Sequence, residues 1–271
     1  MLSYLAALGV GLLAGTHTAT WGMYKDAPHE GFRHYPRSII LAAIAAPLLA
    51  WMAHLNALTA PGIVVLFGVT YCVERGLSEF YKTFVRVEDQ SKYTIPMQFH
   101  VLGKVVHGDA QRWAAAAIYV VMYSLAAWGV SVAQTRLGSP NPAMFLLFGS
   151  AGGWLSAFGG ALKDAPIEGF QTLKFFRSPL IAAGYALLLS CWTDNYLLVA
   201  AGALGYTIAT IETYKTFFFP SKPRGKFANK PILHPEHLET RKRYVPLYAG
   251  IWLFVIVSVV LAFLGPERAG G

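Results

Sequence analysis

The sequence predicts an all-α integral membrane protein of about eight transmembrane helices, built as two tandem parallel four-helix repeats. Three observations lead to this prediction. The 271 residues are 55% hydrophobic and only 13% charged, which would leave a soluble domain of this size with large exposed apolar patches. Apolar runs of roughly 20 residues recur along the chain, long enough for a helix to cross a ~30 Å hydrocarbon core. A charged motif near residue 25 recurs near residue 163.

Each predicted helix is an apolar run that ends at charged residues or at a short polar turn. The runs lie near 2–22, 38–57, 61–81, 113–134, 142–162, 177–193, 195–213 and 244–264. The first lacks the basic start of a signal peptide and aligns with the fifth, so we interpret it as a helix of the mature chain. The sixth is kept short by Asp194 and Asn195. Cys72 and Cys191 fall inside two runs and are interpreted as buried thiols.

The basic residues are distributed unevenly between these helices. The formal net charge is +8. Lys and Arg fall in segments 23–37, 82–112, 163–177 and 214–243, with Arg75, Arg136 and Arg268 as the exceptions. The positive-inside rule therefore places the four segments in the cytoplasm and both termini outside, and we expect a plasma (inner) membrane. The charge is interpreted as a topology signal with contacts to anionic lipid headgroups, and no nucleic-acid partner is expected.

An internal repeat is the strongest pattern in the sequence. Residues 25–32 read KDAPHEGF and residues 163–170 read KDAPIEGF, so seven of eight positions match. Residues 79–84 (EFYKTF) recur as 212–217 (ETYKTF). Self-similarity of this kind indicates a duplicated structural unit.

The repeat divides the chain into two four-helix units, residues 1–134 and 135–271. Because each unit has an even number of helices, both enter the membrane in the same sense and are related by an axis along the membrane normal. Paired glycines recur on the first helix of each unit, at Gly11, Gly15, Gly149 and Gly153. Glycines at this spacing let helices approach closely, and we expect the first and fifth helices to pack near the pseudo-two-fold axis. The alternative is that they reflect the ordinary glycine content of membrane helices.

The KDAPxEGF motif begins where the first helix of each unit leaves the bilayer. Asp before Ala-Pro and Glu is typical of a helix start, which combines a side-chain cap with proline in the first turn. As a phosphate or headgroup site, the motif and its neighbours offer the anion-binding residues Lys25, Arg37, Lys82, Lys163, Arg177 and Lys215. The candidate catalytic acids are Asp26, Asp164, Glu30 and Glu168, of which Asp26 and Asp164 are also candidate metal ligands. The alternative is a capping device with salt bridges at the interface.

Three further polar residues lie inside the predicted spans of the first unit and have uncharged counterparts in the second. Glu74 and Arg75 are functional candidates, since an ionisable group at that depth costs several kcal/mol unless it is paired. Long side chains about two turns from the interface can also reach water. His17 is interpreted as a satisfied buried group. No recognised zinc spacing links the loop histidines His100, His107, His234 and His237.

The run 153–158 (GWLSAF), followed by Lys163-Asp164 and by EGF at 168–170, resembles the cytoplasmic signature of membrane CTP:lipid-phosphate cytidylyltransferases, including CDP-archaeol synthases. The resemblance covers a short part of each half. It implies that Asp26 and Asp164 are metal ligands and that Lys25 and Lys163 bind phosphate. The terminal acidic metal-binding run of that family is absent from this sequence.

Three functions fit these features. The first is a membrane-embedded enzyme of lipid or isoprenoid metabolism, a transferase acting on a phosphorylated or nucleotide-activated substrate at the cytoplasmic face. Its cofactor is unknown, with Mg²⁺ as the candidate, and its partners are membrane lipid and an anionic headgroup or phosphate-containing small molecule. The second is a transporter or flippase for a small anion or lipid headgroup. A transporter binds its substrate near the membrane midplane, and the small number of polar residues predicted there counts against this function. The third is an accessory subunit with a membrane-protein partner.

Overall fold

The computed structural model describes residues 1–32, 35–137, 141–218 and 225–265, and this part of the chain is almost wholly helical. The long helices are α1 (Leu2–Glu30), α2 (Tyr35–Met52), α3 (Ala60–Phe80), α4 (Asp109–Leu137), α5 (Pro142–Lys163), α7 (Thr172–Ser190), α8 (Tyr196–Thr213) and α10 (Val245–Leu264). The short elements are η1 (Tyr81–Val85), β1 (His100–Val101), β2 (Lys104–Val105), α6 (Ala165–Glu168), η2 (Tyr214–Phe218), η3 (Gly225–Phe227), α9 (His237–Thr240) and η4 (Arg241–Tyr244).

Seven helices of the described residues are long and apolar enough to cross a bilayer. They span Leu2–Glu30, Tyr35–Met52, Ala60–Val85, Asp109–Leu137, Pro142–Lys163, Tyr196–Phe218 and His237–Leu264. The prediction of an all-α integral membrane protein is therefore confirmed. The sixth predicted span forms α7, which is not among the seven because Lys174 and Arg177 occupy its first turns and leave its apolar part short.

Several helices run past their predicted ends. α1 continues through the KDAP segment to Glu30, with Pro28 in its last turn. α3 and α8 each pass directly into a π-helical turn, η1 and η2, at the repeated YKTF sequence. The two π-helical turns occupy corresponding places in the two halves of the chain. Such turns are frequent at functional sites.

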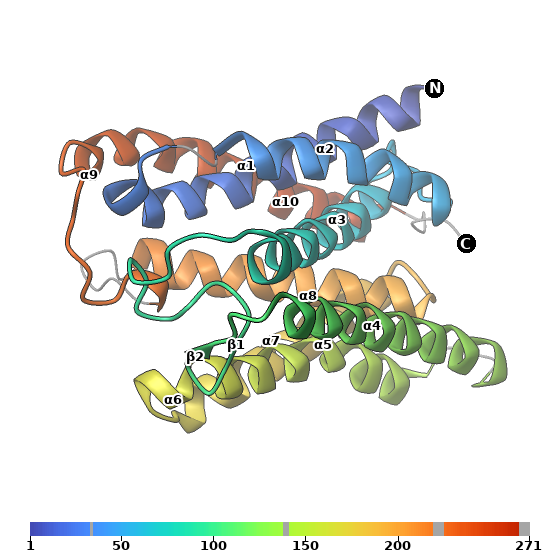
Figure 1. Ribbon diagram of the computed structural model, residues 1–271. Helices are drawn as coiled ribbons and strands as arrows, with labels where there is room; N and C mark the ends of the chain where they lie inside the picture. Colours follow the sequence, from blue (N-terminus) through green and yellow to red (C-terminus); the bar gives the residue numbers. More distant parts are fainter. Residues whose placement is uncertain (33–34, 138–140, 219–224, 266–271) are drawn as a thin grey trace.

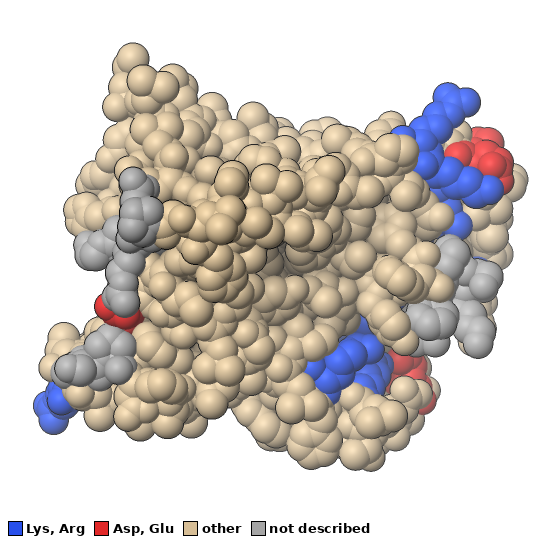
Figure 2. Space-filling model, turned by 180° about the vertical axis from the view of Figure 1, so that it is seen from behind, with Lys and Arg blue, Asp and Glu red and all other residues tan. Residues whose placement is uncertain are grey.

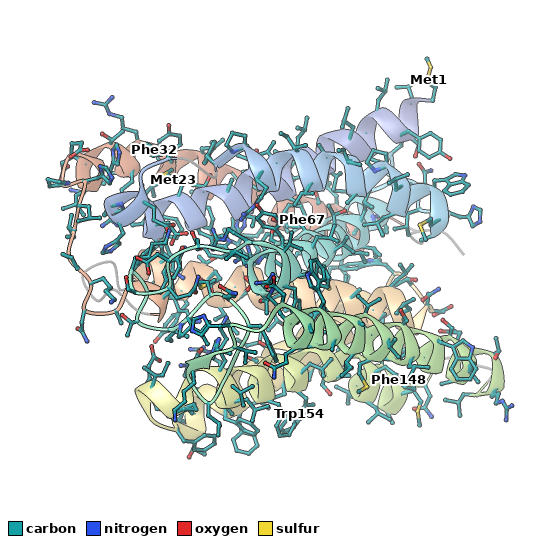
Figure 3. The ribbon with its side chains drawn as sticks, in the orientation of Figure 1. Met1, Met23, Phe32, Phe67, Phe148 and Trp154 are labelled. Carbon is teal, nitrogen blue, oxygen red and sulfur yellow. The ribbon has the colours of Figure 1, made fainter. Side chains whose placement is uncertain are left out.

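The centre of the molecule is the crossing of α3 and α8 (Figure 1). A Cβ added at Gly205 would lie 1.9 Å from the carbonyl oxygen of Gly68, so only glycine lets the two backbones meet there. Phe67, which is buried, lies beside this crossing in the middle of the molecule (Figure 3). We expected the first and fifth helices to pack near the pseudo-two-fold axis, but α1 packs mainly against α2, α5 packs mainly against α7, and the two halves meet at α3 and α8.

The paired glycines of α1 and α5 pack within their own half of the chain. An added Cβ at Gly15 would lie 2.6 Å from the Ser38 carbonyl oxygen of α2, and one at Gly153 would lie 2.6 Å from the Ser178 carbonyl oxygen of α7. The glycines therefore serve close helix packing, as predicted, but their partner is the next helix along the chain.

The fourth long helix of each half packs across to the other half. α10 contacts α3 and α1, whereas α4 contacts α8. The Tyr248 ring of α10 stacks on the His17 ring of α1, with ring centroids 4.0 Å apart. The Gln134 amide of α4 donates a hydrogen bond to the Asp194 carbonyl oxygen at 3.0 Å. The two halves of the chain are thus interleaved.

Charge and apolar surface are separated along the helix axes. Figure 2 shows Lys and Arg gathered mainly at one end of the molecule, with a broad uncharged belt between the ends. Large apolar side chains are exposed along the long helices, among them Trp128 of α4, Ile44 of α2 and Leu253 of α10, as expected of a surface that lipid covers. The end that carries α6, α9 and the β1–β2 hairpin lies opposite the start of α1 (Figure 1). Cys191 is exposed beyond the end of α7, so its interpretation as a buried thiol is wrong.

Candidate functional site

A cavity of about 470 Å³ opens at the charged end of the molecule, between helices of both halves. Its walls come from α1, α2, α3 with η1, α5 and α8 with η2. Among the described residues, the cationic side chains that line it are Lys25, Arg37, Arg75, Lys82, Arg86, Lys163, Lys215 and Lys226. The carboxylates that line it are Asp26, Glu30, Glu79, Asp164 and Glu212. Cations outnumber carboxylates, so the cavity is electropositive.

Most residues singled out in the sequence lie on this cavity. Lys25, Arg37, Lys82, Lys163 and Lys215 all line it, together with Asp26, Glu30 and Asp164. Arg177 and Glu168 line an adjoining hollow, which shares Lys25, Asp164 and Lys215 with the cavity. The structure thus brings the two repeated motifs to one place, and the roles of these residues in binding and catalysis stay predictions.

The acids of the first motif are held by lysines from the long loops. The Asp26 carboxylate lies 2.9 Å from Lys226 Nζ. The Glu30 carboxylate lies 3.3 Å from Lys226 Nζ and 3.1 Å from Lys92 Nζ, and it accepts a hydrogen bond of 2.6 Å from the Tyr93 hydroxyl. Each acid is therefore already paired, as the salt-bridge part of the alternative predicts. The capping part is wrong for the first motif, because α1 continues through Asp26.

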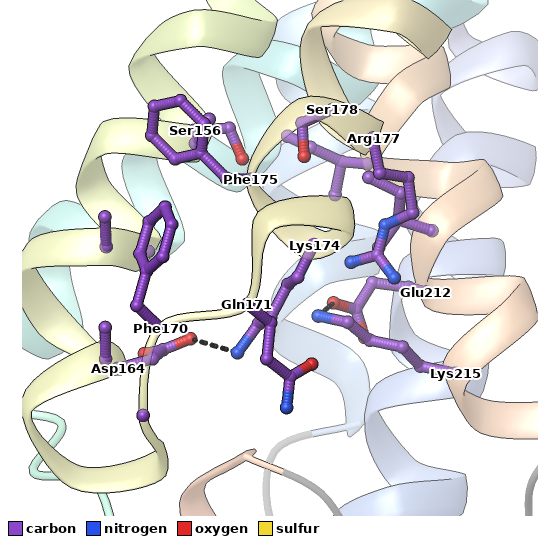
Figure 4. A pocket seen from close by; sticks show the side chains of 17 residues that line it. Ser156, Asp164, Phe170, Gln171, Lys174, Phe175, Arg177, Ser178, Glu212 and Lys215 are labelled. Atoms are coloured by element: carbon purple, nitrogen blue, oxygen red, sulfur yellow. Dashed lines mark hydrogen bonds and ion pairs between the residues drawn. The ribbon is translucent and has the colours of Figure 1, made fainter.

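The acids of the second motif share one lysine. Lys174 Nζ lies 3.5 Å from the Asp164 carboxylate (Figure 4). It also lies 2.9 Å from the Glu168 carboxylate. All three side chains are only partly buried. In contrast with the first motif, no long-loop lysine reaches these acids within the described residues.

Ion pairs also connect the two halves across the cavity. Lys25 of α1 lies 2.9 Å from the Glu212 carboxylate of α8, which also lies 3.5 Å from Lys215. At the equivalent place in the first half, Glu79 pairs with Lys82 at 2.5 Å, and Lys163 of α5 lies near enough to interact electrostatically with Glu79. The repeated Glu-x-x-Lys pairs therefore each face the lysine of the opposite motif.

Two cations of the cavity form no ion pair within the described residues. Lys163 has no carboxylate oxygen within 4.0 Å there, and neither has Arg37. The Arg37 guanidinium stacks over the Tyr81 ring at 5.7 Å, and its Nε is buried without a hydrogen-bond partner. A buried donor without a partner is costly, so an anion in the cavity would meet unsatisfied donors.

Glycines form part of the cavity wall. Gly22 of α1 and Gly159 and Gly160 of α5 line the cavity, and an added Cβ at any of them would meet no atom within 4 Å. These glycines are not needed for helix packing, unlike Gly15 and Gly153. Their effect is to leave space beside the cations.

A smaller pocket of about 140 Å³ adjoins the cavity under α7. It shares Asp164, Glu212 and Lys215 with the cavity, and Phe170 and Phe175 form its apolar side (Figure 4). The polar cavity thus adjoins a pocket with an aromatic wall.

Sequence reasoning missed several residues of the site. Lys226, Arg86, Lys174 and Tyr93 contact the predicted acids or line the cavity. A signal for Lys226 is present in the sequence, since Lys226 and Lys92 occupy corresponding places in the two long loops, and both reach Glu30.

The polar residues inside the first unit have partners. Arg75 lines the cavity, pairs with Glu79 and lies over the Trp21 ring. Glu74 is fully buried and accepts a hydrogen bond of 2.7 Å from Ser78. His17 is buried, and its Nδ1 lies 3.1 Å from the Tyr71 hydroxyl. Its Nε2 is buried without a hydrogen-bond partner within the described residues, so its interpretation as a buried group is confirmed but only one of its nitrogens is satisfied.

No protein-family model, no curated protein and no solved structure matches this chain.

Proposed function

We propose that the chain is a membrane-embedded enzyme of lipid metabolism, a transferase that binds a phosphorylated or nucleotide-activated substrate in the electropositive cavity. The observation that carries this proposal is the excess of cations over carboxylates in a cavity of about 470 Å³. Cavities of roughly 300–1,000 Å³ are typical of small-molecule sites. Lys163 and Arg37 are the first contacts for the anion, because neither has a carboxylate oxygen of the described residues within 4.0 Å.

The proposal includes the finer architecture. Eight crossings, with α7 as the eighth, form two parallel four-helix repeats over residues 1–134 and 135–271. The corresponding packing of Gly15 on α2 and Gly153 on α7 supports this arrangement. The charged end faces the cytoplasm of a plasma (inner) membrane and both termini lie outside, as the distribution of Lys and Arg favours.

The adjoining pocket supports a lipid as one substrate. A phosphate beside Lys215 and Arg177 would lie next to the aromatic wall of Phe170 and Phe175. An apolar chain attached to that phosphate can follow this wall while its charge stays with the cations. The short resemblance to lipid-phosphate cytidylyltransferases agrees with such a substrate.

Asp26 and Asp164 are the proposed ligands of a Mg²⁺ ion. Each is now paired with a lysine, Asp26 with Lys226 and Asp164 with Lys174. Mg²⁺ is usually bound by one or two carboxylates together with substrate phosphates, so these residues fit an ion that binds with the phosphate. Glu30 and Glu168 stay candidate acids that position the two motifs.

Binding of a lipid phosphate to the purified protein tests the proposal. We expect a short-chain phosphatidate to bind, and diacylglycerol of the same chain length not to bind, by isothermal titration in detergent. Lys25→Gln/Lys163→Gln should weaken phosphatidate binding at least tenfold, since a charge-assisted hydrogen bond contributes about 1.5–3 kcal/mol. Inorganic phosphate and a nucleoside triphosphate, added as competitors, show whether the headgroup alone is recognised.

The matched control is Lys104→Gln/Lys242→Gln, which removes the same charge outside the cavity. Equal loss of affinity in the two double variants would contradict the proposal, because it would mean that net charge alone attracts the lipid. Mg²⁺-dependent transfer is a separate readout, and we expect Asp26→Asn/Asp164→Asn to abolish it while phosphatidate binding persists.

A further inference from the structure

The loop that precedes α10 is fastened to the end of α1. Backbone N–H groups of Leu233 and His234 donate hydrogen bonds to the Pro28 carbonyl oxygen at 2.9 and 3.0 Å. The His29 imidazole Nδ1 lies 2.8 Å from the Pro231 carbonyl oxygen. We call residues 230–240 the strap, and these bonds hold it against the first KDAPxEGF motif.

Within the strap, a turn brings three side chains together that can bind a metal ion. The His237 N–H donates to the His234 carbonyl oxygen at 3.1 Å, which closes the turn around Glu236. One ligand atom from each of His234, Glu236 and His237 lies within 4.8 Å of the others. Nδ1 of His234 lies 3.3 Å from the Glu236 carboxylate, and Nε2 of His237 lies 3.9 Å from it.

We propose that His234, Glu236 and His237 form a binding site for a divalent transition-metal ion, with Zn²⁺ the best fit. Two imidazoles and a glutamate are a ligand set that tetrahedral zinc takes, with the fourth position left to water. Zinc–ligand bonds of about 2.0–2.2 Å place neighbouring ligand atoms roughly 3.4 Å apart in a tetrahedron. The Glu236 carboxylate lies 3.3 and 3.9 Å from the two imidazole nitrogens, and all three ligand atoms lie within 4.8 Å, so rotation of the side chains can bring them to that geometry. Imidazole favours Zn²⁺, Cu²⁺ and Ni²⁺ over Mg²⁺.

The surroundings of the cluster make it a prepared site. The Phe32 ring contacts His237 edge-on, with ring centroids 4.3 Å apart. The strap's bonds to Pro28 hold the turn before any ion binds, so little conformational entropy is lost on binding. The cluster also differs from the proposed Mg²⁺ site, since its donors are imidazoles and Asp26 is engaged by Lys226.

The site was not predicted from the sequence, because the spacing of the four loop histidines, taken together, matches no known zinc motif. His100 and His107 belong to the other long loop, and the structure instead supplies Glu236 as the third ligand. The bound ion would rigidify the turn beside Pro28 and so steady the first motif.

Metal titration tests this inference. The protein is purified in detergent through an affinity tag without histidine, stripped with a chelator and titrated with Zn²⁺ against a chromophoric chelator. We expect one tight Zn²⁺ per chain, and a Co²⁺ complex with the visible absorption of a tetrahedral site. His234→Ala, His237→Ala and Glu236→Gln should each weaken binding at least tenfold, since even residues that only support a ligand cost 10–100-fold.

The matched control is His107→Ala, which removes an exposed histidine from the other long loop and should leave binding unchanged. Glu236→Gln alters only an exposed side chain, so loss of binding there with an unchanged elution profile supports the site directly. Absence of tight Zn²⁺ binding in the unmodified protein, or retention of binding in His234→Ala/His237→Ala, would overturn the inference.

Discussion

At the residue scale, the site depends on how each buried carboxylate is satisfied. Glu30 accepts from Tyr93 and pairs with Lys92 and Lys226, so the long loops are bound to the end of α1 through one side chain. Burial, followed by the hydrogen bond to Glu30, raises the pKa of the Tyr93 hydroxyl. Tyr93 therefore stays a hydrogen-bond donor throughout the neutral range.

Replacing Tyr93 by Phe tests this network. At pH 7, Tyr93→Phe should lower the free energy of unfolding by about 1.5–3 kcal/mol, because Glu30 and Glu88 lose a donor. The folded pKa lies above the unfolded value of about 10, so the contribution of Tyr93 is complete below pH 10 and is lost as the pH rises further. Thermal denaturation in detergent should show the difference between wild type and variant shrinking above that pH.

The control for this comparison is Tyr4→Phe, at the exposed start of α1. It should leave stability within about 0.5 kcal/mol of the wild type. A Tyr93→Phe variant as stable as Tyr4→Phe at pH 7 would show that the loops are held by other contacts.

At the element scale, the apolar runs predict that the long segments are helices and where these lie along the chain. They do not predict the residue at which each helix ends or the helix against which it packs. Asp26, Pro28 and Glu30 predict a new helix start, yet α1 continues through them. The reason is tertiary, because the Pro28 carbonyl oxygen and the Glu30 carboxylate are bound by residues of the distant loops. Gly11 and Gly15 correctly predicted close packing, but spacing on one helix cannot identify the helix opposite.

Glycine substitutions test these helix contacts. Gly15→Ala and Gly153→Ala should each destabilise the protein by about 1–3 kcal/mol, since the new Cβ meets backbone at 2.6 Å and the helices must move apart. Gly9→Ala on α1 and Gly184→Ala on α7 are the controls, because an added Cβ there meets no atom within 4 Å. Alanine should be neutral or stabilising by up to about 1 kcal/mol at the control positions.

Thermal denaturation of the four variants measures the effect. Similar stabilities for Gly15→Ala and Gly9→Ala, or for Gly153→Ala and Gly184→Ala, would contradict the close approach of α1 to α2 or of α5 to α7.

At the scale of the whole molecule, much of the site could be predicted because charged residues that repeat at one membrane face must meet at one surface. Lys25, Lys163, Lys82 and Lys215 line a common cavity for this reason. The interleaving of α4 and α10 with the opposite halves could not be predicted, since an apolar helix shows no preference among apolar neighbours. The contribution of Lys226 depends on the path of a long loop, which hydropathy does not describe.

The central claim is that both KDAPxEGF segments lie at the same membrane face and so share one cavity. Cysteine accessibility in intact cells tests it most directly, in a background with Cys72→Ser and Cys191→Ser. Single cysteines replace the exposed residues Lys104 and Glu168 at the charged end, and Leu58 and Arg136 at the other. A membrane-impermeant maleimide should label Leu58→Cys and Arg136→Cys in intact cells, and Lys104→Cys and Glu168→Cys only after the membrane is permeabilised. Labelling of Lys104→Cys and Glu168→Cys from opposite sides would contradict the account.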